Sequence, residues 1–327
     1  MNIRLETAIE TWPMKAPFRI TGHTFTDADI LVVSLSDGAN TGRGEAAGVY
    51  YRGETPPGIL AEIEAARGAI EAGPTRQALR DILSPGGARN AVDCALWALE
   101  AARAGRPVWQ LAGLPTPRPL LTTCTVGAAE PSAMAERARE YVEARAIKMK
   151  LLGDGRDGAR VAAVRAAKPD VWLAVDANQG FTRETLEALK PELIEARVAL
   201  IEQPFAIGED AMLDGARGPI PVAADESAQS LADIAGLVGR YDVVNIKLDK
   251  CGGLTEGLMM AAEARRVGLK VMVGCMSGTS LAMAPGFVLG QLCDVVDLDA
   301  PMFLAADRAP SVRYQDGHIH CDETVWG

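Results

Sequence analysis

The chain has 327 residues and a formal net charge of −10, from 43 acidic and 33 basic residues. With 48% hydrophobic residues and a mean hydropathy of +0.06 it can fill a large core, which excludes an intrinsically disordered chain. The acidic balance and the lack of a Lys/Arg-rich segment predict no nucleic-acid partner. The length exceeds the roughly 250 residues of a bare (β/α) barrel, which leaves room for a second, smaller unit.

Neither a signal peptide nor a membrane span is expected. Residues 1–10 contain Arg4, Glu6 and Glu10 without an apolar core, and the sequence has no run of about eighteen apolar residues. The six cysteines show no CxxC spacing and lie mostly within apolar runs, which is typical of reduced thiols. We therefore expect a cytoplasmic protein with no membrane partner.

The first hundred-odd residues predict a separate α+β unit. Strands are expected at 2–10 and 29–36, and a Gly-rich turn then leads into a third short strand near Glu45. Helices are expected at 57–72, 75–83 and 88–104. Strands followed by helices are typical of an α+β unit. The Pro-rich segment 115–119 marks its end, so we place this unit at residues 1–116.

From residue 117 onward the sequence repeats a strand and a helix. A strand is expected at 119–126, and seven further strand-like runs end in a polar residue every 22 to 28 positions: Lys150, Asp176, Glu202, Asp225, Lys247, Cys275 and Asp297. Each interval holds one strand, one helix and two short loops. Helices are expected near 131–145, 155–168, 182–196, 229–239, 254–267 and 280–292. The repeat predicts an α/β fold with a (β/α) barrel over 117–302, whose strand C-termini meet on one face and host the chemistry.

Lys148 and Lys150 close one predicted strand. Because side chains two residues apart project to the same face of a strand, both ammonium groups should enter the mouth of the barrel. Their mutual repulsion and their burial would both lower the lysine pKa, so that one of them could act as a neutral base near pH 7. A solvated strand end with two ordinary lysines is the alternative.

Asp176, Glu202 and Asp225 end three successive strands, which makes them neighbours around the rim. Three carboxylates need compensation, either from arginines or from a shared divalent cation, and Mg²⁺ prefers carboxylate oxygens. No Arg or His lies beside these strand ends, which favours Mg²⁺. Taken singly, each acid would be a helix N-cap or a loop charge.

Lys247 ends the next strand, across the ring from Lys150. A cation with a lysine on each side suits proton transfer at carbon, because a bound cation stabilises an enediolate while one lysine removes the α-proton and the other returns it from the opposite face. The product would have the inverted stereocentre.

Several motifs together resemble the muconate-lactonizing subgroup of the enolase superfamily. They are Lys148-Met-Lys150, Asp176-Ala-Asn178, Ile201-Glu202-Gln203-Pro204, Ala224-Asp225-Glu226-Ser227 and Asn245-Ile-Lys247-Leu-Asp249-Lys250-Cys-Gly-Gly253. Residues 88–97 resemble the capping domain of that family, so the resemblance covers nearly the full chain. It implies a (β/α)7β TIM-like barrel with an N-terminal capping domain, on which the C-terminal tail 303–327 packs.

Within this subgroup, Gly274-Cys275-Met276 and Asp297-Leu-Asp299 resemble the dipeptide epimerases of the L-Ala-D/L-Glu type. The resemblance implies a dipeptide substrate, Mg²⁺ held by the three carboxylates, and Lys150 and Lys247 as the acid/base pair. In the dipeptide epimerases the aspartate pair holds the α-ammonium group of the substrate. Further substrate contacts are implied for Thr125, Lys148, Asn178, Cys275, Asp297 and Asp299.

The chain departs from that type at residues 20–25, where an arginine that pairs with a glutamate side chain is expected and Ile-Thr-Gly-His-Thr-Phe stands instead. Arg19 or Arg52 could substitute, or His23 and Phe25 could select another side chain. N-succinylamino acid racemase and o-succinylbenzoate synthase are the nearest alternatives, although their substrates lack a free α-ammonium. A non-catalytic, ligand-binding barrel is the alternative from another class. The sequence leaves open the dipeptide and whether the chain is a homo-oligomer.

Overall fold

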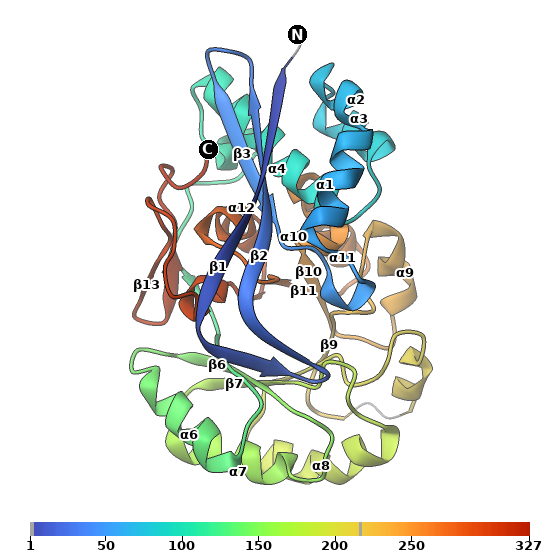
Figure 1. Ribbon diagram of the computed structural model, residues 1–327. Helices are drawn as coiled ribbons and strands as arrows, with labels where there is room; N and C mark the ends of the chain where they lie inside the picture. Colours follow the sequence, from blue (N-terminus) through green and yellow to red (C-terminus); the bar gives the residue numbers. More distant parts are fainter. Residues whose placement is uncertain (1–2, 216–217) are drawn as a thin grey trace.

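The computed structural model describes residues 3–215 and 218–327; the first residue of the predicted strand 2–10 lies outside this part. The chain opens with a long antiparallel hairpin, which runs down the front of the molecule and ends over the barrel (Figure 1). Its strands are β1 (Arg4–Ile20) and β2 (His23–Ser36), and β3 (Thr41–Ala46) pairs with β2. The hairpin extends well beyond the predicted strands, because partly buried Trp12, Met14 and Phe18 continue it past position 10 and the pairing resumes, after an irregularity between Pro13 and Phe18, as far as Ile20 with His23.

Helices cover one face of this three-stranded sheet. They are α1 (Pro56–Ala65), α2 (Arg67–Glu71), α3 (Arg76–Ile82), α4 (Gly87–Ala104) and the short α5 (Val108–Leu111), which the sequence did not predict. Helix α4 lies directly on β3, because Gly42 and Gly44 carry no side chain. A Cβ at Gly42 would lie 2.1 Å from the carbonyl oxygen of Ala95, and one at Gly44 would lie 2.3 Å from that of Ala91. The Gly-rich turn is therefore a close-packing device.

Eight parallel strands follow in sequential order. They are β5 (Cys124–Val126), β6 (Ala146–Lys150), β7 (Trp172–Asp176), β8 (Leu200–Glu202), β9 (Val222–Ala224), β10 (Val243–Lys247), β11 (Lys270–Gly274) and β12 (Val295–Val296). The sheet curls so that its ends meet, since the backbone N–H of Thr123 donates to the carbonyl of Val296 at 3.1 Å. This is the predicted α/β barrel architecture with an N-terminal unit.

The outer helices lie where the repeat predicted them. They are α6 (Pro131–Glu140), α7 (Asp157–Ala167), α8 (Arg183–Glu195), α11 (Leu254–Arg266) and α12 (Ser280–Gly290). The helix predicted at 229–239 is shorter than expected, a 3-10 turn η3 (Leu231–Asp233) followed by α9 (Ile234–Leu237). Strands β8 and β9 are joined through the 3-10 turn η2 (Asp210–Leu213), and a short α10 (Leu248–Cys251) directly follows β10. No helix of the described residues is long and apolar enough to cross a membrane.

The predicted strand 119–126 divides into two. Its first part, β4 (Leu120–Leu121), leaves the barrel and pairs with β14 (His318–His320), which in turn pairs with β13 (Arg313–Gln315). The tail then reaches the N-terminal unit, where the indole N–H of Trp326 donates to the carbonyl of Arg43 at 2.8 Å. The limits 1–116, 117–302 and 303–327 remain a prediction. All six cysteines are free thiols.

Candidate active site

The C-terminal ends of the central barrel strands bring three carboxylates together. Asp176 and Glu202 end β7 and β8, and Asp225 follows β9. One oxygen from each lies within 4.8 Å of the others, and all three side chains are fully buried. Oε2 of Glu202 has no hydrogen bond, while Oε1 accepts one from the side-chain amide of Asn245 at 2.8 Å. A buried carboxylate oxygen that makes no hydrogen bond, with only the Lys148 ammonium 3.4 Å away, suits a divalent cation when other acids converge on it.

Lysines flank this carboxylate triad on both sides. Nζ of Lys150, on β6, lies 2.5 Å from Asp176, and Nζ of Lys247, on β10, lies 2.7 Å from Asp225. Lys250, on α10, also pairs with Asp225 at 2.6 Å and is completely buried. Because the strand order is β6 to β10 without interruption, the two lysines stand at opposite ends of the triad.

A second pair of carboxylates follows β12. Asp297 makes an ion pair with Lys148 and accepts a hydrogen bond from the hydroxyl of Thr123. Asp299 accepts the backbone N–H of Thr125 at 2.6 Å. Both carboxylates are 4% exposed, and Lys148 also lies 3.4 Å from Glu202. Lys148 therefore connects the aspartate pair to the carboxylate triad.

The buried charged residues at the C-terminal ends of the strands form the floor of the site, and their crowding shifts the pKa of several of them. Burial and the neighbouring Asp176 raise the pKa of Glu202 from 4.5 to about 8. Burial acts in the same direction on Asp225, but the ammonium groups of Lys247 and Lys250 outweigh it and hold the pKa of that carboxyl well below its usual range. Burial and the adjacent Asp297 raise the pKa of Asp299 to about 7.

The expected low lysine pKa is wrong for Lys148. Burial does lower the pKa of its ammonium, but Asp297, Glu202 and Asp176 outweigh burial and raise it well above the usual value. The same balance raises the pKa of Lys247, for which Asp225 is the main partner. The prediction considered the repulsion between lysines and omitted the carboxylates that separate them.

The floor of the site carries an excess of negative charge. Four buried lysines face six buried carboxylates, which leaves a formal charge of −2: Asp176, Glu202, Asp225, Glu226, Asp297 and Asp299 against Lys148, Lys150, Lys247 and Lys250. One divalent cation neutralises that excess. The residues present thus fit a Mg²⁺ ion in charge, in donor type and in convergence.

Loop geometry fixes the triad. Gln203 follows Glu202 with a positive φ of 34°, and its side-chain oxygen accepts the backbone N–H of Asp225 at 2.9 Å. Asn178 also has a positive φ, 42°, and its backbone N–H donates to Asp176 at 2.8 Å. Such left-handed backbone is uncommon outside glycine and is held here by surrounding bonds. The short amide bridges explain why the carboxylates converge.

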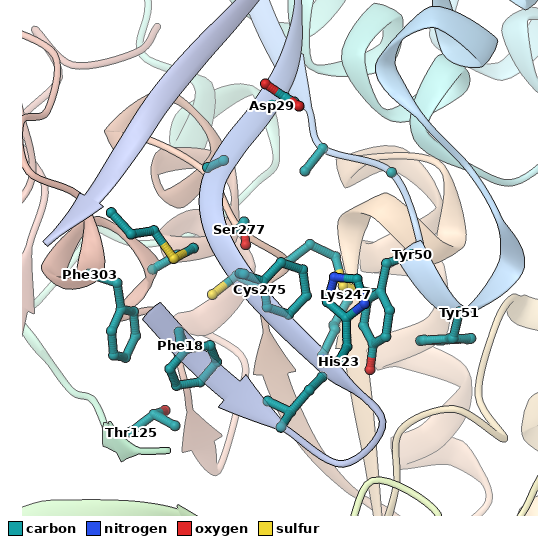
Figure 2. Close-up of a pocket in the computed structure, with 18 of the residues that line it drawn as sticks. Phe18, His23, Asp29, Tyr50, Tyr51, Thr125, Lys247, Cys275, Ser277 and Phe303 are labelled. Carbon is teal, nitrogen blue, oxygen red and sulfur yellow. The ribbon is translucent and has the colours of Figure 1, made fainter. Parts of the chain in front are cut away.

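A cavity of about 390 Å³ lies between this floor and the N-terminal unit. The predicted substrate contacts Thr125, Lys148, Asn178, Cys275, Asp297 and Asp299 all line it, as do Lys150 and Lys247. The carboxylate triad lies below them. Figure 2 shows the opposite side of the cavity, where Phe18 and His23 from the hairpin tip and Tyr50 and Tyr51 from the 3-10 turn η1 (Tyr50–Arg52) reach toward Lys247 and Cys275.

Some residues of the cavity were not predicted as functional. Phe18 lies on an exposed stretch of β1, and Phe303 belongs to the 3-10 turn η4 (Ala300–Phe303). Two buried residues of the site occurred in the family motifs but were assigned no role in the sequence analysis. They are Glu226, whose Oε2 has no hydrogen bond, and Lys250. The spacing of three between Lys247 and Lys250 was the available signal for the second lysine.

The proposed arginine substitutes do not lie in the cavity. Arg52 donates to the side chain of Gln229 at 3.0 Å and pairs with Glu54 at 3.0 Å, and Arg19 is exposed. Neither lines the cavity, and no arginine of residues 3–215 or 218–327 does. His23, Tyr50 and Tyr51 do line it.

The fold and this site define a barrel in which buried lysines flank a carboxylate triad that fits a divalent cation, under an α+β unit. The chain belongs to the mandelate racemase/muconate lactonizing enzyme family of enolase-type proteins. The N-terminal domain model of that family matches residues 2–113, and the enolase C-terminal domain-like model matches residues 133–324.

Several proteins of known activity or structure are similar to this chain over most of its length. The L-Ala-D/L-Glu epimerase of Escherichia coli is 38% identical over 95% of this chain and 97% of its own. An N-acetyl-D-glutamate racemase of Pseudoalteromonas is 40% identical over 76% of this chain and 79% of its own. The crystal structure of an enolase family member from Agrobacterium tumefaciens, with sodium and L-Ala-L-Glu bound, has 42% identity and a TM-score of 0.96 over 99% of this chain and 100% of its own.

Proposed function

We propose that this protein is a Mg²⁺-dependent dipeptide epimerase that inverts the α-carbon of the C-terminal residue of a dipeptide. The observation that carries the proposal is the symmetric order Lys150, Asp176, Glu202, Asp225, Lys247 on five adjacent strands. An acid/base group on each face of a carbon allows a proton to be removed on one face and returned on the other.

Lys150 and Lys247 are assigned the acid/base roles. Each ammonium is within 2.7 Å of a carboxylate of the triad, and both side chains line the cavity. When bound, Mg²⁺ supplies positive charge that stabilises the carboxylate of the substrate as its α-carbon loses a proton. Asp176, Glu202 and Asp225 would hold it. Asp225 is the main group that raises the pKa of Lys247, so engaging this carboxylate with a cation would favour the neutral amine needed as a base.

Asp297 and Asp299 are assigned to the α-ammonium group of the dipeptide. Burial and mutual repulsion make this carboxylate pair unfavourable unless a cation faces it. Thr125 holds Asp299 through its backbone N–H, and Lys148 holds Asp297. A substrate ammonium would complete the pairing. Asn178, Cys275 and Lys148 line the same cavity and would contact the substrate.

An N-acylamino acid racemase is the second candidate, favoured by the 40% identity to the Pseudoalteromonas enzyme. It would use the same lysines and carboxylate triad. Its substrate offers no ammonium to Asp297 and Asp299, which is why we rank it second.

The test is solvent exchange. The protein with Mg²⁺ should be incubated in D₂O with a dipeptide library and, separately, with N-acetyl and N-succinyl amino acids. Mass spectrometry reads deuterium incorporation, and chiral chromatography reads inversion. We expect both in dipeptides, and neither after chelation of divalent metal. Exchange confined to the N-acyl set would establish the second candidate, and exchange in neither set would favour a ligand-binding barrel.

A further inference from the structure

Six aromatic rings form one continuous wall on the side of the cavity opposite the carboxylate triad. This aromatic wall consists of Phe18, His23, Phe25, Tyr50, Tyr51 and Phe303. Successive ring centroids are 4.7 Å apart for Phe303 and Phe18, 6.4 Å for Phe18 and Phe25, and 5.4 Å for Phe25 and Tyr50. These are the separations of packed aromatic pairs. The wall therefore joins the hairpin tip, the η1 turn and the C-terminal η4 turn.

The wall has two parts, which face different parts of the floor. The rings of His23, Phe25 and Tyr50 pack within 5.4 Å of one another, and Tyr50 is coupled electrostatically to Lys247. Figure 2 shows His23 and Tyr50 of this part on the side of Lys247. Phe18 lies at the other end, where a Cβ on Gly127 would be 3.4 Å from its ring, near Thr125 and the aspartate pair.

A substrate fixed at both ends would meet these parts in order. Its α-ammonium would lie at Asp297 and Asp299, on the side of Phe18 and Phe303, and its reacting carbon between Lys150 and Lys247. The side chain on the reacting carbon would then extend toward His23, Phe25 and Tyr50.

That part of the cavity offers no lysine or arginine for an acidic side chain, and its one imidazole, that of His23, packs against the rings of Phe25 and Tyr50. Among the described residues that line the cavity, the ammonium groups belong to Lys148, Lys150 and Lys247, and each already pairs with a carboxylate of the floor. Asp27 and Asp29 line its outer part, exposed and bonded to threonine hydroxyls. A buried carboxylate beside them would remain unpaired, whereas an apolar side chain loses only water.

We infer that the epimerised residue of the substrate has an apolar and preferably aromatic side chain, which packs on His23, Phe25 and Tyr50. The inference rests on the proposed function and names its substrate class. It assigns a specificity role to these three residues, while the chemistry remains on the barrel. Replacing glutamate by leucine, phenylalanine or tyrosine at the C-terminal position should raise kcat/KM roughly 10- to 100-fold, the range expected for burying one large side chain.

The decisive assay is competition among L-Ala-L-Xaa dipeptides in D₂O with Mg²⁺, in which the initial rate of deuterium incorporation gives relative kcat/KM. The wild-type enzyme should prefer Xaa = Phe, Tyr or Leu over Glu and over Lys by about tenfold or more. A preference for Glu, a preference for Lys, or equal rates would each overturn the inference while exchange itself upholds the proposed function. If no dipeptide in the set incorporates deuterium, that result would instead refute the proposed function.

Variants of the wall make the test specific. Phe25→Arg should invert the preference toward L-Ala-L-Glu, because it places a guanidinium where the ring packs. Val142→Arg is the matched control, since Val142 is 82% exposed and outside the cavity, and it should keep the wild-type ratio. Phe25→Ala covers the case of a misfolded arginine variant: it should lower kcat/KM for L-Ala-L-Phe about tenfold with little change for L-Ala-L-Ala. An unchanged ratio in both Phe25 variants would overturn the assignment.

Discussion

Replacing Glu202 by glutamine should stabilise the metal-free protein while abolishing its metal site. In the floor of the site Glu202 is completely buried between Asp176 and Asp225, and its Oε2 has no hydrogen bond. Glutamine has nearly the same shape and keeps the acceptor that Asn245 uses at 2.8 Å. The substitution removes one like charge from a buried triad, so its two effects should have opposite signs.

The magnitude follows from the pKa of this carboxyl. Burial and Asp176 raise it from 4.5 to about 8, so the folded protein binds a proton that the unfolded chain releases at pH 7. The stability contributed by this proton is complete below pH 4.5 and is lost as the pH rises toward 8. At about 1.4 kcal/mol per pH unit, the penalty at pH 7 is about 3 kcal/mol. That pKa already includes the Lys148 ammonium 3.4 Å away, which lowers it; the glutamine amide that would face this ammonium offsets part of the gain, so Glu202→Gln should gain about 1 to 3 kcal/mol.

Urea unfolding in EDTA at pH 5 and pH 8 measures this effect. Wild type should lose stability between the two values, and Glu202→Gln should lose less. Glu209→Gln, an exposed site, is the matched control and should behave as wild type. Mg²⁺ at a hundred times its Kd should then stabilise wild type by about 2.7 kcal/mol and the Glu202 variant by nothing. A Glu202→Gln protein that is less stable than wild type without metal, or that binds Mg²⁺ equally well, would refute the reasoning.

Four other substitutions test separate parts of the structure. Lys150→Met should lower the rate of inversion at least about 10³-fold, and so should Lys247→Met. Each variant should still exchange deuterium into one enantiomer, and that enantiomer should differ between the two variants, as read by NMR in D₂O. Loss of exchange with both enantiomers in either variant would contradict a two-sided mechanism. Gly274→Ala should lower kcat about 100-fold without unfolding, because its Cβ would lie 2.7 Å from Oδ1 of Asn245 and 3.1 Å from Cε of Lys247; circular dichroism checks the fold. Gly42→Ala should cost about 2 to 3 kcal/mol in urea unfolding, because its Cβ meets the backbone of α4 at 2.1 Å.

Much of the floor could be predicted because, in a parallel barrel, residues that end successive strands in the sequence lie at the same level of the barrel. A strand that ends in Asp176 or Glu202 presents that residue at the same level as its neighbours, so spacing in the sequence becomes distance in space. The three carboxylates and the order of the flanking lysines followed from that rule. The (β/α) repeat also gave the outer helices, apart from the shorter one after β9, where η3 and α9 replace a full helix.

The wall of the cavity could not be predicted in the same way. Phe18 and Phe25 lie on the far half of the hairpin, where partly buried Trp12, Met14 and Phe18 alternate with exposed residues, but Pro13 and Pro17 interrupt the pattern and argue against a strand. Phe303 comes from a turn 285 residues away from Phe18, and their contact at 4.7 Å depends on how two units pack. The prediction of a low pKa for Lys148 was wrong for a related reason, because this pKa depends on which carboxylates lie within a few ångström of the ammonium.

Charge balance connects the floor to the choice of substrate. One Mg²⁺ ion would neutralise the formal charge of −2 on the floor, and a zwitterionic dipeptide with an apolar side chain adds no net charge. An N-acylamino acid would bring a carboxylate without an ammonium, and L-Ala-L-Glu would bring a second carboxylate toward a wall that has no lysine or arginine. Both would leave uncompensated negative charge in a buried site, which is costly. The same electrostatic argument therefore favours the dipeptide over the N-acyl substrate and the aromatic side chain over the acidic one.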